Sequence, residues 1–108
     1  MLHYEVAGQG KSIVFLHGFM ENSKIWNPFV SLFSETHQVI TIDLTGHGKS
    51  LTQNETNSIE TMADDVIEVV KHLGVERATF VGHSMGGYVS LALAEVYPQF
   101  VDKVVLVN

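Results

Sequence analysis

Short apolar segments that alternate with helical patterns constrain the fold of this chain more than any other sequence feature. The segments at residues 12–16 (SIVFL), 38–43 (QVITID) and 78–81 (ATFV) are rich in β-branched and aromatic side chains. Such runs are typical of strands buried on both faces in a parallel sheet. We expect a further strand at residues 103–107 (KVVLV) and a weaker one at residues 2–6.

Helical patterns occupy the intervals between these strands. The first begins at residues 22–23, and Pro28 falls within its early part. The second begins at Asn57, which forms a capping-box pattern with Glu60, and it ends at Gly74. Its apolar residues recur with the helical period: Ile59, Met62, Ala63, Val66, Val69, Val70 and Leu73.

A third helix is expected over residues 85–97, where the sequence is apolar almost all round, and we expect this helix to be largely buried. The alternation of strands and helices predicts an α/β fold, with a mostly parallel sheet and helices on both faces. We expect the strands at residues 12–16 and 78–81 to be central in this sheet.

Composition limits the classes of function that fit the chain. Its 108 residues, 45% of them hydrophobic, suffice for one small domain. A formal net charge of −6 and scattered Lys and Arg argue against binding to nucleic acid or to an anionic membrane. The sequence has no cysteine, no basic and apolar leader, and no apolar stretch of membrane-spanning length. We therefore expect a soluble, cytoplasmic domain without disulfides.

One serine lies between two glycines at the junction of a predicted strand and a predicted helix. Gly82-His83-Ser84-Met85-Gly86 matches G-x-S-x-G in the context that a nucleophile elbow requires. A sharp turn there would lift the Ser84 hydroxyl above the sheet edge, and side chains at positions 82 and 86 would collide with that turn. The amino end of the following helix would stabilise an oxyanion nearby. Taken alone, the same serine could simply cap the helix.

Two further motifs follow the predicted strands that precede this serine. His17-Gly18-Phe19 comes after residues 12–16, and Asp43-Leu44-Thr45-Gly46-His47-Gly48-Lys49-Ser50 comes at the end of the next strand. Together with the serine motif, they occur in the order and near the spacings of the α/β-hydrolase fold, which the chain resembles over essentially all of its length. The resemblance is to the N-terminal part of that fold. Residues 1–108 then form a partial core without the C-terminal strands, the lid and the triad Asp and His.

The resemblance implies roles for residues in these motifs. Ser84 corresponds to the family's nucleophile, and the backbone N–H groups of Phe19 and Met85 correspond to the donors of its oxyanion hole. Residues that would support the site are His17, Gly18, Gly82, His83 and Gly86. Serine at position 84, where some relatives carry aspartate, favours acyl transfer over haloalkane or epoxide opening. The expected substrate is a small molecule with an acyl group, and no cofactor is expected.

None of the six histidines is assigned as the general base of Ser84. His83 adjoins the serine and is expected to point away across the turn, while His17 and His47 are expected to brace their own turns. The remaining three look like surface or strand-edge residues without metal-ligand spacing, so no metal is predicted: His3, His37 and His72.

The acidic residues do not complete a triad either. In the family, the residue at Asp43 more often braces the Gly46-His47-Gly48 turn, and Asp64-Asp65 are expected to complement a helix dipole near its first turn. The family's acid and histidine follow the nucleophile in the chain. Here no histidine follows Ser84, and Asp102 precedes the last strand. We therefore expect the general base to lie outside these residues.

Three functional interpretations remain open at this point. The first is a serine hydrolase that cleaves an ester, thioester or related acyl substrate. The second is a relative that hydrolyses C–C bonds or acts as a lyase, as in menaquinone synthesis, and the third is a non-catalytic scaffold that binds a ligand or partner. The last strand has few charges to protect its edge, so residues 103–108 are expected to pair with a C-terminal half of the fold or with another copy.

Overall fold

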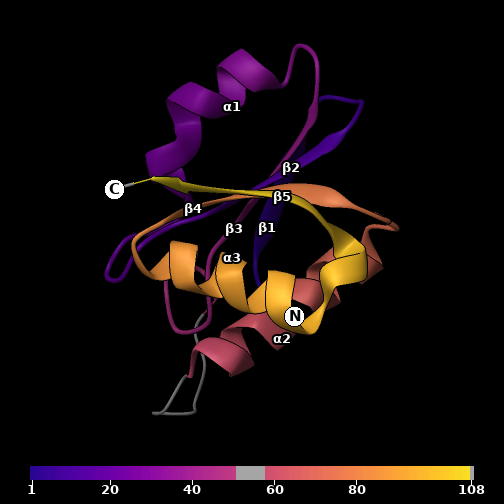
Figure 1. Ribbon diagram of the computed structural model, residues 1–108. Coiled ribbons are helices and arrows are strands. Elements are labelled where there is room, and N and C mark those ends of the chain that lie inside the picture. The colour runs from indigo at the N-terminus through magenta and orange to yellow at the C-terminus, as the bar shows by residue number, and fades with distance from the viewer. Residues whose placement is uncertain (51–57, 108) are drawn as a thin grey trace.

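A sheet in the order β1-β3-β2-β4-β5 organises the chain (Figure 1). The computed structural model describes residues 1–50 and 58–107. Its strands are β1 (Tyr4–Ala7), β2 (Ser12–Leu16), β3 (Gln38–Ile42), β4 (Ala78–His83) and β5 (Val101–Val107). Only β1 runs antiparallel to its neighbour, and the other pairs are parallel. The predicted α/β fold with a mostly parallel sheet is confirmed, although β1 begins later and β5 begins earlier than the sequence indicated.

The pairing of β2 with β4 fixes where the sequence motifs meet. Leu16 lies opposite Gly82 in the parallel register. Because both strands run in the same direction, the segments that follow them emerge side by side at the carboxyl edge of the sheet. The turn that begins at His17 therefore lies next to the turn at Ser84, although the two are far apart in the sequence.

Helices cover both faces of the sheet, as expected (Figure 1). One face carries the 3-10 turn η1 (Ser23–Trp26) and α1 (Asn27–Phe33), and the other carries α2 (Ile59–His72) and α3 (Met85–Val96), which the short turn η2 (Pro98–Phe100) follows. Pro28 lies in the first turn of α1, so the helix predicted from residues 22–23 is divided into a 3-10 turn and an α-helix.

Alternate residues of β2 enter two hydrophobic clusters. Val14 and Leu16 pack in the larger cluster under α2 and α3, together with residues that include Phe80 and Leu93. The smaller cluster lies under α1 and contains Ile13, Phe15, Trp26 and Val39. The ring centroids of Phe15 and Trp26 are 4.9 Å apart. Burial on both faces explains why this strand is continuously apolar in sequence.

The cap of helix α2 lies one residue after the expected one. Ser58 caps the helix, because its hydroxyl accepts a hydrogen bond of 3.1 Å from the N–H of Thr61, and the Asn57 of the predicted capping box lies outside the described residues. The predicted apolar face is buried along Met62, Ala63, Val66, Val69 and Val70. None of the described helices has the length and apolar content needed to cross a membrane.

The expectation that Asp64 and Asp65 serve the helix dipole is wrong. They lie in the second turn of α2, and the first turn contains only Glu60 as an acidic residue. Their carboxylates instead accept hydrogen bonds from hydroxyl groups of other elements. Asp65 accepts from Thr45 at 2.6 Å, and Asp64 accepts from Tyr97 at 2.5 Å. These contacts connect α2 to the turn after β3 and to the end of α3.

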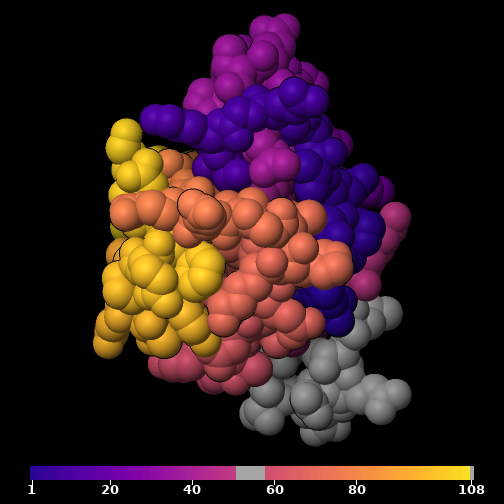
Figure 2. Space-filling view, turned by 90° about the vertical axis from the view of Figure 1, so that its right-hand side faces the viewer, coloured from indigo at the N-terminus to yellow at the C-terminus, as the bar shows by residue number. Residues whose placement is uncertain are grey.

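The expectation that α3 is largely buried is also wrong. One face of the helix packs on the sheet through Val89 and Leu93, but Tyr88 and Leu91 remain 67% and 47% exposed. The apolar composition of residues 85–97 gives this helix the capacity to be buried. Its actual burial depends on which other elements cover it. The adjacent β5 is largely exposed as well. The yellow part of the chain, which includes β5, lies on one side of the surface in Figure 2.

Two leucines of α3 allow a matched test of this arrangement. Replacing the fully buried Leu93 by alanine should lower the free energy of unfolding by about 2–5 kcal/mol, because it removes packing atoms and leaves a cavity. The change Leu91→Ala on the exposed face should alter it by no more than about 0.5 kcal/mol. Urea unfolding followed by circular dichroism measures both, and equal losses would contradict the one-sided packing of α3.

Candidate active site

Ser84 occupies a strained turn between β4 and α3. Its backbone angles are φ 55° and ψ −113°, in a region that residues with a side chain seldom adopt. Such a conformation costs about 1–3 kcal/mol and persists only where the surrounding structure imposes it. The side chain of Ser84 is exposed at the carboxyl edge of the sheet. A strained, exposed serine at this position has the conformation that the G-x-S-x-G pattern predicts.

The two glycines around this serine leave no room for a side chain. A Cβ atom on Gly82 would lie 2.3 Å from the carbonyl oxygen of Gly86, inside the turn itself. A Cβ atom on Gly86 would lie 2.1 Å from the carbonyl oxygen of Leu16 in β2. Gly86 therefore allows the first turn of α3 to approach the end of the neighbouring strand, a contact the sequence interpretation had not assigned to it.

His17 is fully buried and uses both ring nitrogens in hydrogen bonds. Nδ1 lies 2.7 Å from the carbonyl oxygen of Gly18, and Nε2 lies 2.9 Å from the backbone nitrogen of Leu44. A carbonyl can only accept and an N–H can only donate, so Nδ1 carries the proton and Nε2 is the acceptor. The ring is therefore neutral. Burial lowers the pKa of His17, which agrees with this assignment.

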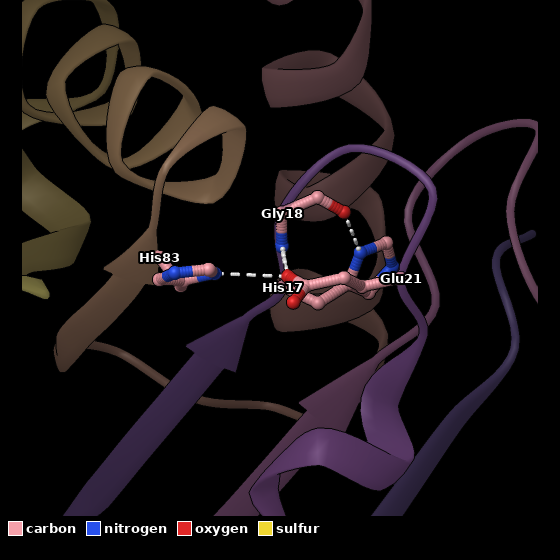
Figure 3. A network of polar contacts seen from close by, with 4 residues as sticks. All are labelled: His17, Gly18, Glu21 and His83. Atoms are coloured by element: carbon pink, nitrogen blue, oxygen red, sulfur yellow. Dashed lines mark hydrogen bonds and ion pairs between the residues drawn. The ribbon is translucent and has the colours of Figure 1, made fainter. Parts of the chain in front are cut away.

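Glu21 connects the turn after β2 with the residue before the serine (Figure 3). Its Oε1 atom accepts a hydrogen bond of 2.7 Å from the N–H of Gly18 and lies 2.9 Å from Nδ1 of His83. The hydrogen bond with His83 is the main reason that the pKa of Glu21 is lowered. The imidazole of His83 thus faces Glu21 in the neighbouring turn. Sequence reasoning missed Glu21, because it lies in a polar stretch before the next helix and no local pattern marks it.

Asp43 holds the turn that follows β3. Its two carboxylate oxygens accept hydrogen bonds from the N–H groups of Ser23 at 2.8 Å and Lys49 at 3.0 Å. Burial would raise the pKa of Asp43, but these hydrogen bonds lower it below its ordinary value. A Cβ atom on Gly48, whose φ is +52°, would lie 2.5 Å from this carboxyl group.

The ring of His47 lies beside that of His17, with centroids 5.2 Å apart.

The two backbone amides expected to form an oxyanion hole lie in these adjoining turns. Met85 is the first residue of α3, so its N–H has no acceptor within the helix. Among the described residues, the N–H of Phe19 donates no hydrogen bond to another part of the backbone. The phenyl ring of Phe19 is 67% exposed and lies edge-on to His47, with centroids 5.7 Å apart.

The remaining acidic candidate does not belong to this site. Asp102 lies near the start of β5, where its carboxylate is 3.9 Å from the guanidinium of Arg77. Because β5 is parallel to β4, its start lies at the edge of the sheet opposite Ser84. Among residues 1–50 and 58–107, no group of three or more His, Asp or Glu side chains could hold a metal ion.

A hollow of about 510 Å³ adjoins Ser84. Polar groups line it at the serine and at His83, and apolar side chains of α3 and β5 line the rest: Tyr88, Leu91, Leu106 and Val107. Ser84, which is exposed, is thus one of the residues that line this hollow.

Residues 11–108 match the family described as alpha/beta hydrolase fold. The chain belongs to the α/β-hydrolase family. Among solved structures, it is similar to Est816, described as an N-acyl homoserine lactone degrading enzyme, with 42% identity and a TM-score of 0.93 over 97% of this chain and 40% of that one. A thermophilic esterase from Thermogutta terrifontis is 32% identical, with a TM-score of 0.94 over 97% of this chain and 39% of that one.

An enol-lactonase from Burkholderia xenovorans is also similar to this α/β-hydrolase chain. It is 31% identical, with a TM-score of 0.90 over 95% of this chain and 41% of that one. The chain spans about a third to two fifths of the length of the curated relatives it matches, namely 31% of one from Mycobacterium tuberculosis and 43% of one from Agrobacterium fabrum.

The buried His17 should make stability depend on pH near neutrality. Its lowered pKa means that the unfolded chain binds a proton first as the pH falls below about 6.5. The contribution of neutral His17 to the free energy of unfolding is therefore complete above that pH, and it is lost progressively as the pH falls below it. Urea unfolding between about pH 5 and pH 7.5 should show the free energy of unfolding rising with pH.

The variant His17→Asn provides the control for this pH dependence. Its amide nitrogen can replace Nδ1 as a donor to Gly18, but the amide does not titrate, and the shorter side chain has no acceptor at the position of Nε2 to bind the N–H of Leu44. The variant should be less stable at pH 7.5 and should lose most of the slope in this range. An unchanged slope would show that another group causes the pH dependence.

Proposed function

We propose that Ser84 is the nucleophile of a serine hydrolase that cleaves an ester, lactone or related acyl substrate. The observation that carries the proposal is the conformation of Ser84, with φ at 55° on an exposed turn between β4 and α3. An ordinary helix-capping serine adopts extended backbone angles and accepts a hydrogen bond from the helix. Ser84 differs in both respects, because its φ is 55° and its side chain makes no cap hydrogen bond.

The proposed reaction follows the usual course of acyl transfer. The Ser84 oxygen attacks the substrate carbonyl as a general base takes the hydroxyl proton, and the carbonyl oxygen becomes an oxyanion. The N–H groups of Met85 and Phe19 would stabilise that oxyanion, together with the positive end of the α3 dipole. As the C–O bond to the leaving group breaks, the base returns this proton to the leaving oxygen. Water then attacks the acyl-enzyme, which releases the acid and restores the Ser84 hydroxyl. His17 is unsuited as the base, because its unprotonated Nε2 accepts from Leu44.

The similar solved structures favour this class of substrate. They are described as an esterase, an enol-lactonase and an enzyme that degrades N-acyl homoserine lactones. Esters and lactones share a carbonyl carbon bonded to an alkoxide leaving group, and a serine nucleophile with two amide donors suits attack on that group. We extend this substrate class to the protein that contains this chain.

The nucleophile can be tested by covalent labelling. A fluorophosphonate probe should label the whole protein at Ser84, and Ser84→Ala should abolish both labelling and hydrolysis of 4-nitrophenyl acetate. The matched control is Ser31→Ala, which removes another exposed hydroxyl on α1 and should label like the wild type. Peptide mass spectrometry identifies the modified residue. Failure of the folded whole protein to label would favour a non-catalytic scaffold.

The 108-residue chain by itself should be a poor catalyst. No histidine follows Ser84 in this sequence, and general-base assistance contributes about 10²–10⁴-fold to rate. Labelling of the isolated chain should therefore be slower than labelling of the whole protein by a factor in that range. Equally fast labelling of a monomeric chain would reveal a base within these residues.

A further inference from the structure

The Glu21 carboxylate joins two turns that the proposed mechanism requires to be held together. Its Oε1 atom contacts Gly18 N at 2.7 Å and His83 Nδ1 at 2.9 Å (Figure 3). Gly18 belongs to the turn after β2, and His83 is the last residue of β4. The side chains of Glu21 and His83 are 31% and 32% exposed, so the contact is partly shielded from water.

Gly18 is confined between these two side chains. A Cβ atom there would lie 2.5 Å from Oε1 of Glu21, 3.0 Å from Nδ1 of His83 and 3.2 Å from the His83 carbonyl oxygen. Because the nearest atom is the end of the Glu21 side chain, a side chain at position 18 would displace that carboxylate from its present place beside Gly18 and His83. The glycine thus permits a direct approach of the turn after β2 to the residue that precedes Ser84.

Hydrogen bonds at Gly18 also set the direction of the Phe19 amide. The Gly18 carbonyl oxygen accepts from Nδ1 of His17 at 2.7 Å and from the N–H of Glu21 at 3.2 Å. In a planar trans peptide, the carbonyl of one residue and the N–H of the next point in opposite directions. Fixing the Gly18 carbonyl therefore fixes the Phe19 N–H, and the Glu21 side chain holds the peptide on the other side of Gly18.

We propose that Glu21 and His83 are positioning residues, which hold the Phe19 amide in place relative to Ser84 during acyl transfer. This inference rests on the proposed function of Ser84 and adds two residues to it. Glu21 orients the turn that contains the donor, and His83 fixes that turn against the strand that ends at the nucleophile. Neither side chain needs to touch the substrate, because both act through the backbone.

Displacement of one oxyanion donor should lower the rate of the chemical step more than the binding of substrate. Removal of such a donor costs about 10²–10³-fold in kcat, so a misplaced donor should cost roughly 10–100-fold. In the whole protein, Glu21→Ala and His83→Ala should each lower kcat for 4-nitrophenyl acetate by that factor, with KM nearly unchanged. The double variant should lose little more than either single variant, because both break the same contact.

Conservative variants provide matched controls for these losses. Glu21→Gln retains an oxygen that can accept from Gly18 and His83, and His83→Asn retains a donor at the place of Nδ1. Both should keep kcat within about threefold of the wild type, since the hydrogen bonds survive. The His83→Asn and His83→Ala pair also keeps the test valid if Glu21→Ala fails to fold. Urea unfolding identifies any variant of that kind.

A second measurement separates positioning from a general loss of stability. A short alkyl trifluoromethyl ketone forms a tetrahedral adduct with a serine nucleophile and places an oxyanion in the hole. Its inhibition constant should rise in Glu21→Ala in parallel with the fall in kcat, whereas KM should stay constant. A structural defect alone would reduce the fraction of active enzyme and leave the inhibition constant unchanged.

The outcomes distinguish the two proposals. If Ser84→Ala retains activity, the proposed function itself fails. If Ser84→Ala is inactive but folded Glu21→Ala and His83→Ala both show wild-type kcat and inhibition constants, only the positioning role is overturned. Equal loss in His83→Asn and His83→Ala would also overturn it, because the imidazole would then act in some way other than through its hydrogen bond to Glu21.

Discussion

The parallel pairing of β2 with β4 is the constraint on which the candidate site depends. The register opposes Leu16 to Gly82, so the two strands end together and release their turns at one edge of the sheet. A shift of one residue in that register would turn the side chains of a strand to the opposite face. The alternate burial of Val14 and Phe15 in two different clusters prevents this shift. The hydrophobic core thus determines the alignment of polar groups that lie outside it.

The strain at Ser84 is maintained from the helix side of the turn. Helix α3 is anchored by the buried Val89 and Leu93, and the Ser90 hydroxyl donates a hydrogen bond of 2.8 Å to the Gly86 carbonyl. Gly86 in turn lies against the carbonyl of Leu16. With the helix fixed at both points, the chain between β4 and α3 has to turn sharply, and the backbone cost at Ser84 is offset by burial elsewhere.

The sequence allowed the strands and the serine turn to be predicted because both depend on local patterns. Continuous apolar runs identify β2 and β4, and Gly82 reflects a contact within the serine turn itself, with the carbonyl of Gly86. The contact between Glu21 and His83 depends on strand order and register, which no local pattern contains. The burial of α3 was misjudged for a related reason, since composition measures the capacity of a helix for burial and says nothing of what covers it.

The two proposed oxyanion donors differ in how firmly their own elements hold them. Met85 begins a helix, so the helical backbone and its core contacts fix its amide. Phe19 lies in a turn between strand and 3-10 helix, and groups on loops are positioned less accurately than groups on regular elements. The turn compensates by placing hydrogen bonds on both sides of Gly18, from His17, from the Glu21 backbone and to the Glu21 carboxylate. The contact of that carboxylate with His83 then fixes the turn that contains the Phe19 amide to β4, the strand that directly precedes Ser84.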